Sequence, residues 1–135
     1  MIYMPRGQDI KWQMEVPEGL TVAIDNQDFF EVFGNLLDNA RKWASHVVTI
    51  KGQETKDTVV LTIIDDGPGV PDELISEIQK RGRRLDERKT GAGLGLSIAK
   101  KVLEAYDARL SIQNIKDGGV RVSVTIPKSS VSSGS

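Results

Sequence analysis

The sequence predicts a two-layer α/β sandwich, in which helices cover one face of a sheet. Short runs rich in Val, Ile and Thr, which are typical of strands, come in pairs and alternate with segments whose apolar residues recur at helical spacing. The length of 135 residues fits one compact domain with a single core. A content of 39% hydrophobic and 27% charged residues is that of an ordinary globular protein.

The beginning of the chain predicts a small β-hairpin. Apolar and polar residues alternate from Ile10 to Val16, which is the period of a half-buried strand. Pro17-Glu18-Gly19 then turns the chain into a second short run over residues 20–24. We therefore expect two short paired strands ahead of the first helix.

A long amphipathic helix is predicted next. Asp25 and Asn26 offer side-chain oxygens that can cap its N-terminus. The apolar residues that follow recur at helical spacing over about five turns. They are Phe29, Phe33, Leu36, Leu37, Ala40 and Ala44.

Two strands and a short helix are predicted in the middle of the chain. Residues 47–51 and 58–64 are β-branched runs joined by a polar turn, so they predict paired strands. Pro71 suits a first helical turn, and acidic residues follow it directly, so we expect a helix over residues 71–81.

The remaining segment predicts a loop, a helix and a hairpin. Residues 82–93 lack an apolar period and are rich in Arg, Lys and Gly, which is typical of a long functional loop. Helical spacing returns over residues 94–106. Two apolar runs at 110–115 and 120–126, joined across Asp117-Gly118-Gly119, predict the final pair of strands.

Composition excludes several classes of function. The net charge of −1 provides no general basic field, so we expect neither a nucleic-acid partner nor a membrane contact. No cysteine is present, and His46 is the only histidine, which excludes disulfides and zinc sites built on these residues. No apolar stretch approaches the ~20 residues of a membrane span. We place the folded domain at residues 1–128 and expect the polar residues 129–135 to form a disordered tail.

The first candidate site lies on the long helix. Glu31, Asn35, Asn39 and Lys42 fall within roughly 80° of one another around the helix axis. Asn disfavours helix interiors, so two of them require a reason. They either face water or use their amide oxygens as ligands for Mg²⁺, which prefers oxygen.

Two glycine-containing segments are the other candidates. Asp65-Asp66-Gly67-Pro68-Gly69 follows a strand and is either a plain turn or a site where a carboxylate accepts a hydrogen bond from an exocyclic amine such as that of adenine. Gly91-Ala92-Gly93-Leu94-Gly95 precedes a helix and is either a hinge or a place where backbone N–H groups meet phosphate. Basic residues between them would lie within reach of such a phosphate; they are Lys80, Arg81, Arg83, Arg84, Arg88 and Lys89.

The order of these motifs resembles one family. GNLLDNARKW, DDGPGV and GAGLGL resemble the N box and the two glycine boxes of sensor histidine kinases, within the ATPase superfamily of Hsp90, gyrase and MutL. The resemblance covers residues 10–127, and residues 78–98 most resemble the PhoQ-like subfamily. It implies the Bergerat-type ATP-binding fold, an α+β sandwich with a mixed, mainly antiparallel sheet of about five strands plus a small hairpin, packed on three helices.

The resemblance also implies residue roles in binding ATP with Mg²⁺ and in donating its γ-phosphoryl group. Asn39 would supply the Mg²⁺ ligand, with Asn35 supporting the metal and the nucleotide, and Lys42 would reach a phosphate. Asp65 would bind the adenine amine. The other nucleotide contacts implied by matching positions are Trp43, Gly67, Gly69, Val70, Arg81, Arg84, Gly91, Gly93, Leu94, Gly95 and Leu96.

The implied partners lie outside these residues. The acceptor histidine would belong to the dimerisation domain of the same full-length kinase, which this chain lacks, and a response regulator would receive the phosphoryl group next. The isolated domain would be a monomer and the cytoplasmic part of an inner-membrane sensor kinase. His46 lacks the signature of an acceptor histidine, so we expect a surface residue.

Two alternatives remain at this stage. One is an anti-sigma-factor serine kinase or another ATPase of the superfamily, although Asn35 stands where the ATP-hydrolysing members commonly carry Glu. The other is a nucleotide-binding module without transfer activity. Gln79, which replaces a Phe of the related proteins, supports this second alternative. Two further departures from the family pattern concern single nucleotide contacts: Ala92 replaces a Gln of PhoQ-like proteins, and Val120 replaces a common Thr.

Overall fold

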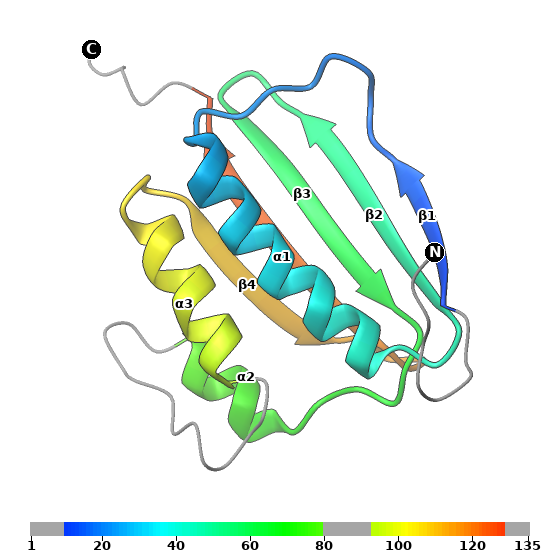
Figure 1. Cartoon of the computed structure of the whole chain (residues 1–135). Helices are drawn as coiled ribbons and strands as arrows, with labels where there is room; N and C mark the ends of the chain where they lie inside the picture. Colours follow the sequence, from blue (N-terminus) through cyan, green and yellow to red (C-terminus); the bar gives the residue numbers. More distant parts are fainter. Residues whose placement is uncertain (1–9, 80–92, 129–135) are drawn as a thin grey trace.

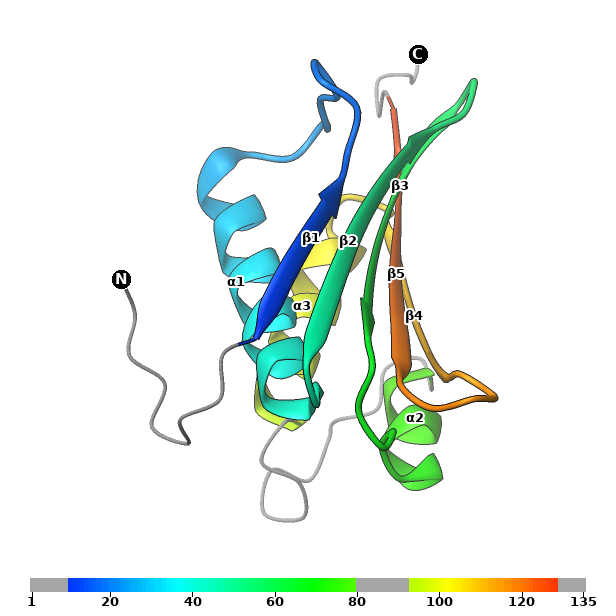
Figure 2. The same ribbon diagram turned by 90° about the vertical axis from the view of Figure 1, so that its right-hand side faces the viewer.

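A computed structural model describes residues 10–79 and 93–128, and it confirms the two-layer α/β class (Figure 1). In chain order the elements are β1 (Lys11–Glu15), α1 (Asn26–Trp43), β2 (Val47–Glu54), β3 (Thr58–Asp65), α2 (Asp72–Gln79), α3 (Gly93–Glu104), β4 (Arg109–Asn114) and β5 (Val120–Pro127). Helices α1 and α3 lie side by side over one face of the sheet, and α2 lies at its end beside β4 (Figures 1 and 2).

The sheet is mixed and has the strand order β1-β2-β3-β5-β4. Strands β2, β3, β5 and β4 pair antiparallel, whereas β1 pairs parallel with β2. The predicted opening hairpin is therefore wrong in part. Strand β1 exists within the predicted range, but residues 20–24 form no strand, and β1 joins the edge of the main sheet instead.

Side-chain packing explains why residues 20–24 are partly buried although they form no strand. Ile24 is buried in the core and Leu20 packs against it. A Cβ atom on Gly52 of β2 would lie 2.9 Å from Leu20 Cδ2 and 3.0 Å from Val16 Cγ1, so the missing side chain at Gly52 makes room for both. These residues bury apolar surface without pairing with a strand.

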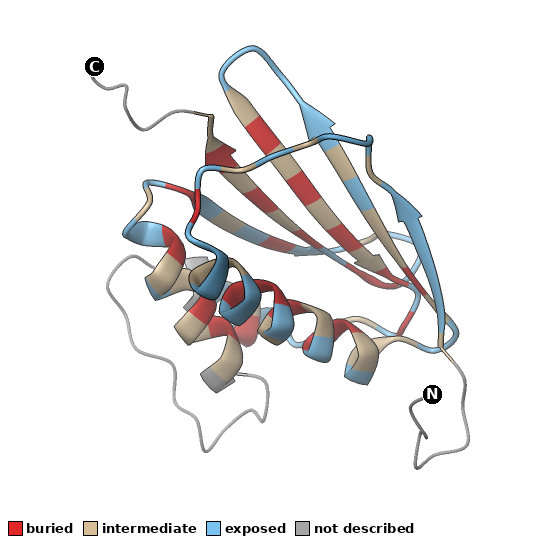
Figure 3. Ribbon diagram, turned by 45° about the horizontal axis from the view of Figure 1, so that its top comes forward, coloured by how far each residue is buried: buried red, intermediate tan, exposed pale blue. Residues whose placement is uncertain are grey.

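The core lies between the sheet and helices α1 and α3. Every second residue of β3 and β5 is buried, as expected for strands with one covered face (Figure 3). Helix α1 contributes a buried stripe at helical spacing, as its apolar pattern predicts. The largest fully buried side chains are Leu36, Ile63, Leu96, Leu103, Ile112 and Ile126.

The N-terminus of α1 is capped as predicted. The Asp25 carboxylate accepts a hydrogen bond from the Gln27 N–H over 3.1 Å. The Tyr106 hydroxyl, which follows α3, donates to Asp28 and accepts from the Asp25 N–H over 3.3 Å. Tyr106 thus joins the end of α3 to the start of α1.

The other predicted elements agree with the structure to within three residues at each end, wherever both ends are described. Most of the predicted 82–93 loop lies outside the described residues; α3 begins at its last residue, Gly93. None of the helices in the described part of the chain combines the length and apolar character that crossing a membrane requires.

Candidate functional site

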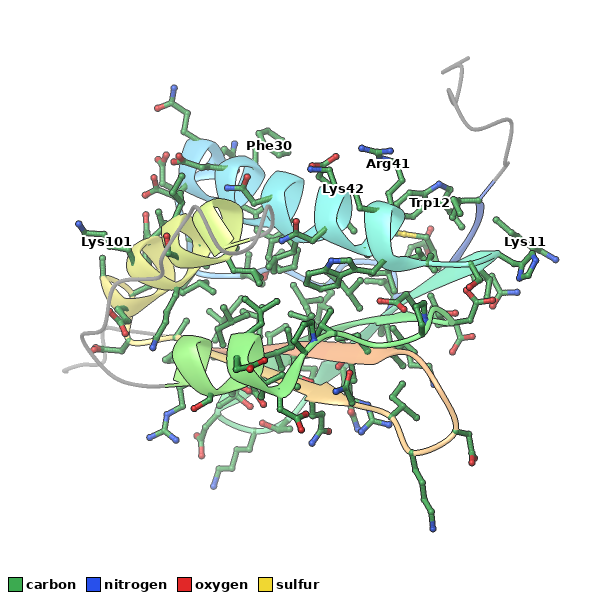
Figure 4. All side chains as sticks on the ribbon, turned by 90° about the horizontal axis from the view of Figure 1, so that it is seen from below. Lys11, Trp12, Phe30, Arg41, Lys42 and Lys101 are labelled. Carbon is green, nitrogen blue, oxygen red and sulfur yellow. The ribbon has the colours of Figure 1, made fainter. Side chains whose placement is uncertain are left out.

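The ends of several strands meet at one end of the sheet. Asp65, the last residue of β3, pairs with Val48 near the start of β2 and with Val120 at the start of β5. Val120 also pairs with Asn114, the last residue of β4. We name this the Asp65 end of the sheet; Figure 4 views the molecule from below Figure 1, where β3 ends.

Asp65 is a buried carboxylate, with only 3% of its surface exposed. Burial raises its pKa, against the opposing effect of hydrogen bonds from the Gly67 and Val120 N–H groups, and the neighbouring charge of Asp66 adds to the increase. The Gly67 N–H donates to Asp65 Oδ1 over 2.8 Å. A charged acceptor fixed in a site with little water forms strong hydrogen bonds with a donor that enters it.

Gly67 holds the loop after β3 against the end of α1. A Cβ atom at this position would lie 1.8 Å from the carbonyl oxygen of Trp43, the last residue of α1. Trp43 itself is half-buried and packs on the core. Gly67 therefore permits a close approach between two backbone segments of the protein.

Asp66 is a structural residue that the sequence reasoning missed. Its Oδ1 accepts hydrogen bonds from three consecutive backbone N–H groups in the α1–β2 turn: Ser45 at 3.0 Å, His46 at 2.8 Å and Val47 at 3.0 Å. Burial acts to raise the pKa of Asp66, but these hydrogen bonds outweigh it and lower the pKa.

Asn114 is the second residue that the sequence reasoning missed. Its Oδ1 accepts from the Val70 N–H over 3.0 Å, and its Nδ2 donates to the Val70 carbonyl over 2.9 Å. Gly69 adopts a φ of +98°, and a Cβ there would lie 2.8 Å from Asn114 Oδ1. Asn114 lies 44 positions from Val70, so no local pattern indicates the contact.

The four polar residues predicted to share one side of α1 differ in their burial. Asn39 is buried, with 4% of its surface exposed, and Asn35 is half-buried. Lys42 and Glu31 are exposed. Lys42 forms an ion pair with Asp38 over 3.2 Å and lies on the outer side of α1 (Figure 4). Of these four residues, only the amides Asn35 and Asn39 therefore face inward.

Asp38 also pairs with Arg41. The Arg41 guanidinium lies 2.6 Å from Asp38 Oδ1 and, together with Lys42, lowers the pKa of that carboxyl against the opposing effect of burial. The Lys42 ammonium has three donors, so its ion pair with Asp38 leaves it able to pair with another anion.

Asn39 Nδ2 is the buried side-chain polar atom without a hydrogen-bond partner within residues 10–79 and 93–128. Such a group costs free energy unless a ligand or water satisfies it. No group of three His, Cys, Asp or Glu side chains that could hold a metal exists within the same ranges. A divalent cation at this site would therefore rely on amide oxygens, water and oxygens that a second ligand brings. Two inward-facing amides fit that requirement.

Helix α3 begins beside these amides. A Cβ on Gly95 would lie 3.3 Å from Asn35 Oδ1, so the start of α3 and the middle of α1 are in close contact. The first turn of α3 contains Gly93, Gly95 and Leu96, and backbone N–H groups in a first turn lack partners within the helix. Leu96 is fully buried, which leaves only its backbone to meet a ligand.

Several predicted residues lie outside the described part of the chain. Arg81, Arg84, Gly91 and Ala92 belong to the segment 80–92, and the side chains of Gln79 and Leu94 are likewise not described. Within the described residues, the 65–70 loop contacts the end of α1 at Trp43, and the start of α3 contacts Asn35 of the same helix. His46 is 87% exposed at its side chain, as expected of a surface residue.

Comparison with known proteins places the chain in one family. Residues 24–130 match the family model described as histidine kinase-, DNA gyrase B- and HSP90-like ATPase. The sensor protein kinase CarS of Pseudomonas aeruginosa is 41% identical over 121 residues, which cover 90% of this chain and 27% of that protein. The virulence sensor histidine kinase PhoQ of Salmonella typhimurium is 33% identical over 123 residues, covering 91% and 25%. The chain therefore spans about a quarter of the length of these relatives.

Solved structures show the same fold. The catalytic domain of the histidine kinase ThkA, in a nucleotide-free form, has a TM-score of 0.73 and 27% identity, covering 88% of this chain and 80% of that one. The mycobacterial sensor histidine kinase MprB has a TM-score of 0.67 and 26% identity, covering 87% and 83%.

Proposed function

Because the chain belongs to the histidine kinase-, DNA gyrase B- and HSP90-like ATPase family, we propose that it is the ATP-binding catalytic domain of a sensor histidine kinase. In this role it binds ATP with Mg²⁺ and positions the γ-phosphoryl group for transfer to a histidine of another domain. The observation that carries the proposal is the contact between Asn35 and Gly95, since it joins one of the two inward amides to the first turn of α3.

The Asp65 end of the sheet would hold the adenine base. The Asp65 carboxylate would accept a hydrogen bond from the exocyclic amine, and its burial excludes competing water. Gly67, Gly69 and Val70 would form the wall beside the base, while Trp43 would lie near it at the end of α1. This arrangement favours adenine over guanine, which carries a carbonyl oxygen at the corresponding position.

The inward amides and α3 would hold the phosphates. Asn39 would hold Mg²⁺ through its amide oxygen, with Asn35 beside it, and the Mg²⁺ neutralises phosphate charge during transfer. Backbone N–H groups at Gly93, Gly95 and Leu96 would donate to phosphate oxygens at the positive end of the α3 dipole. Lys42 would pair with a phosphate beside its contact with Asp38. Arg81, Arg84, Gly91 and Leu94 complete the proposed contacts.

Transfer in this site needs positioning and charge neutralisation more than a base supplied by the domain. The acceptor would be a histidine of the dimerisation domain, and a response regulator would then take the phosphoryl group. We do not propose His46 as the acceptor, because it lies at the α1–β2 turn without the sequence signature of an acceptor histidine. The parent protein would be a membrane sensor with this domain in the cytoplasm.

The test combines the domain, the dimerisation domain of the same kinase and ATP labelled at the γ-phosphate. We expect Mg²⁺-dependent ATP binding and acid-labile phosphohistidine on the dimerisation domain. ATP binding without phosphohistidine would indicate a nucleotide-binding module, and phosphoserine on a protein substrate would indicate the serine-kinase alternative. Failure to bind ATP at all would overturn the proposal.

A further inference from the structure

The last residue of β4 is bound to the loop that follows β3. Asn114 uses both polar atoms of its amide on Val70, accepting from the N–H over 3.0 Å and donating to the carbonyl over 2.9 Å. A side-chain amide carries one acceptor and a donor group, and a backbone residue offers the complementary pair. The two contacts together fix both the distance and the orientation of Val70.

The contact closes one side of the 65–70 loop. The loop begins at Asp65, which is held in the sheet by its pairing with Val120, and Val120 in turn pairs with Asn114. The loop ends just before α2, which packs on β4 (Figure 2). Gly69 lies against Asn114 Oδ1 in a backbone conformation with a φ of +98°. Asn114 therefore sets the conformation of the loop at its far end.

Asn114 is exposed, so it does not belong to the hydrophobic core. Its replacement opens no cavity, and the expected effect on global stability is small. The effect falls instead on the 65–70 loop, which would need to become ordered when a ligand binds. Ordering a loop on binding weakens affinity, and a loop that is already ordered avoids this cost.

We propose that Asn114 is a positioning residue for the base end of the nucleotide site, acting through Val70 and Gly69 without touching the nucleotide. This inference rests on the proposed function. It adds a residue from β4 to a site otherwise built from α1, the 65–70 loop and α3.

The test compares Asn114→Ala with Gln113→Ala in the whole 135-residue chain. Gln113 is the matched control, since it is the preceding exposed amide of β4, and its Oε1 accepts from Arg121 over 2.8 Å rather than from the loop. Calorimetry gives the affinities for ATP, ADP and adenosine in the presence of Mg²⁺. Amide exchange by NMR in the nucleotide-free protein gives the protection of the Val70 N–H.

We expect Asn114→Ala to weaken all three ligands by a common factor of about fivefold, which corresponds to about 1 kcal/mol. Exchange at Val70 should become faster, while the urea midpoint and exchange at the core residue Ile112 stay at wild-type values. Gln113→Ala should change none of these quantities.

Wild-type affinities in Asn114→Ala would overturn the inference while leaving the proposed function intact. A loss confined to ATP would also overturn it, because the residue would then act at the phosphates. An unfolded Asn114→Ala, seen as a collapsed urea midpoint, would assign the residue to overall stability and reject the positioning role. Absence of ATP binding by the wild type would overturn the proposed function and this inference together.

Discussion

Asn39 combines deep burial with an amide nitrogen, Nδ2, that has no hydrogen-bond partner, which is unfavourable in an unliganded protein. A buried donor without a partner lowers the stability of the fold, but it can form a hydrogen bond with a ligand. We therefore interpret Asn39 as a binding residue: an acceptor oxygen of ATP would satisfy Nδ2, and the amide oxygen would be the Mg²⁺ ligand.

We predict that Asn39→Ala abolishes measurable Mg²⁺-dependent ATP binding and lowers the free energy of unfolding by less than about 1 kcal/mol. The small stability effect is expected because no hydrogen bond of Nδ2 is lost. Calorimetry and urea unfolding measure the two quantities. Gln27→Ala, at the exposed start of the same helix, is the control and should bind like the wild type. An unchanged ATP affinity in Asn39→Ala would refute the metal role.

Asp65 carries the predicted base recognition, and its replacement separates affinity from stability. We predict that Asp65→Asn weakens ATP binding by about 1–3 kcal/mol, because a hydrogen bond to a charged acceptor is lost. Stability at pH 7 should change by less than about 1 kcal/mol, since removal of a buried charge offsets the weaker hydrogen bonds. Equal affinity of the wild type for ATP and GTP would contradict this assignment.

The pH dependence of Asp65 has a definite sign. Its folded pKa is raised, so the folded protein takes up this proton at a higher pH than the unfolded chain does. As pH falls from the folded pKa towards the unfolded value of about 3.9, the wild type should gain stability relative to Asp65→Asn. Urea unfolding followed by tryptophan fluorescence across this window measures the difference. A wild type that loses stability relative to the variant would show that the pKa is not raised.

At the scale of elements, the interlock between α1 and the loop after β3 depends on one missing side chain. We predict that Gly67→Ala lowers the free energy of unfolding by about 1–3 kcal/mol, because a Cβ 1.8 Å from the Trp43 carbonyl must push the two segments apart. ATP affinity should fall as well, since the loop forms the proposed base site. Urea unfolding and calorimetry test both effects.

Gly34 is the matched control on α1. It is exposed, and a Cβ there would meet nothing within 4 Å. Gly34→Ala should therefore raise the free energy of unfolding by about 0.5–1 kcal/mol, as expected for a helix interior. If both variants changed stability in the same direction, contact with Trp43 would not explain Gly67.

The sequence predicted the helices and most strands correctly, but it did not predict the conformation of residues 20–24. Periodicity located α1 and the strands because the core needs one buried stripe or face from each. The same reasoning made residues 20–24 a strand, because Leu20 and Ile24 are apolar. Their burial comes from packing on Gly52 and the core, and local pattern does not reveal which partner an apolar run will have.

In the candidate site, too, local motifs could be recognised in the sequence, whereas contacts between distant residues could not. Asn35, Asn39 and Asp65 could be proposed from motifs whose spacing is local. Asp66 and Asn114 could not be assigned, because they act on backbone groups 19 to 21 and 44 positions away. Such contacts exist only once the sheet has set its register, so they belong to the folded molecule rather than to a sequence window.

At the scale of the whole molecule, Asp66 links α1, β2 and β3 through one carboxylate. We predict that Asp66→Ala lowers the free energy of unfolding at pH 7 by about 2 kcal/mol, as expected for loss of a charged acceptor shared by three N–H groups. Because the folded pKa is lowered, this contribution is present above the unfolded value of about 3.9 and is lost as pH falls through the folded pKa.

Acid titration of stability, followed by urea unfolding, checks this prediction. The gap between the wild type and Asp66→Ala should close in strong acid. Asp57→Ala, which removes an exposed carboxylate from the β2–β3 turn, serves as the control and should follow the wild type. A gap of constant size at all pH values would indicate that the carboxylate charge is not responsible.

The parallel pairing of β1 determines at which end of the sheet the chain enters the domain. Lys11 pairs with Val47 and its N–H donates to His46 over 2.8 Å, so the chain enters the sheet at the Asp65 end. Pro127 pairs with Thr58, so β5 finishes at the opposite end of β3, roughly 23 Å away for an eight-residue strand. A phosphoacceptor joined ahead of Lys11 by a short linker would meet the proposed nucleotide site at a high effective concentration. Joined after Pro127, the same acceptor would need a linker long enough to return along the whole sheet.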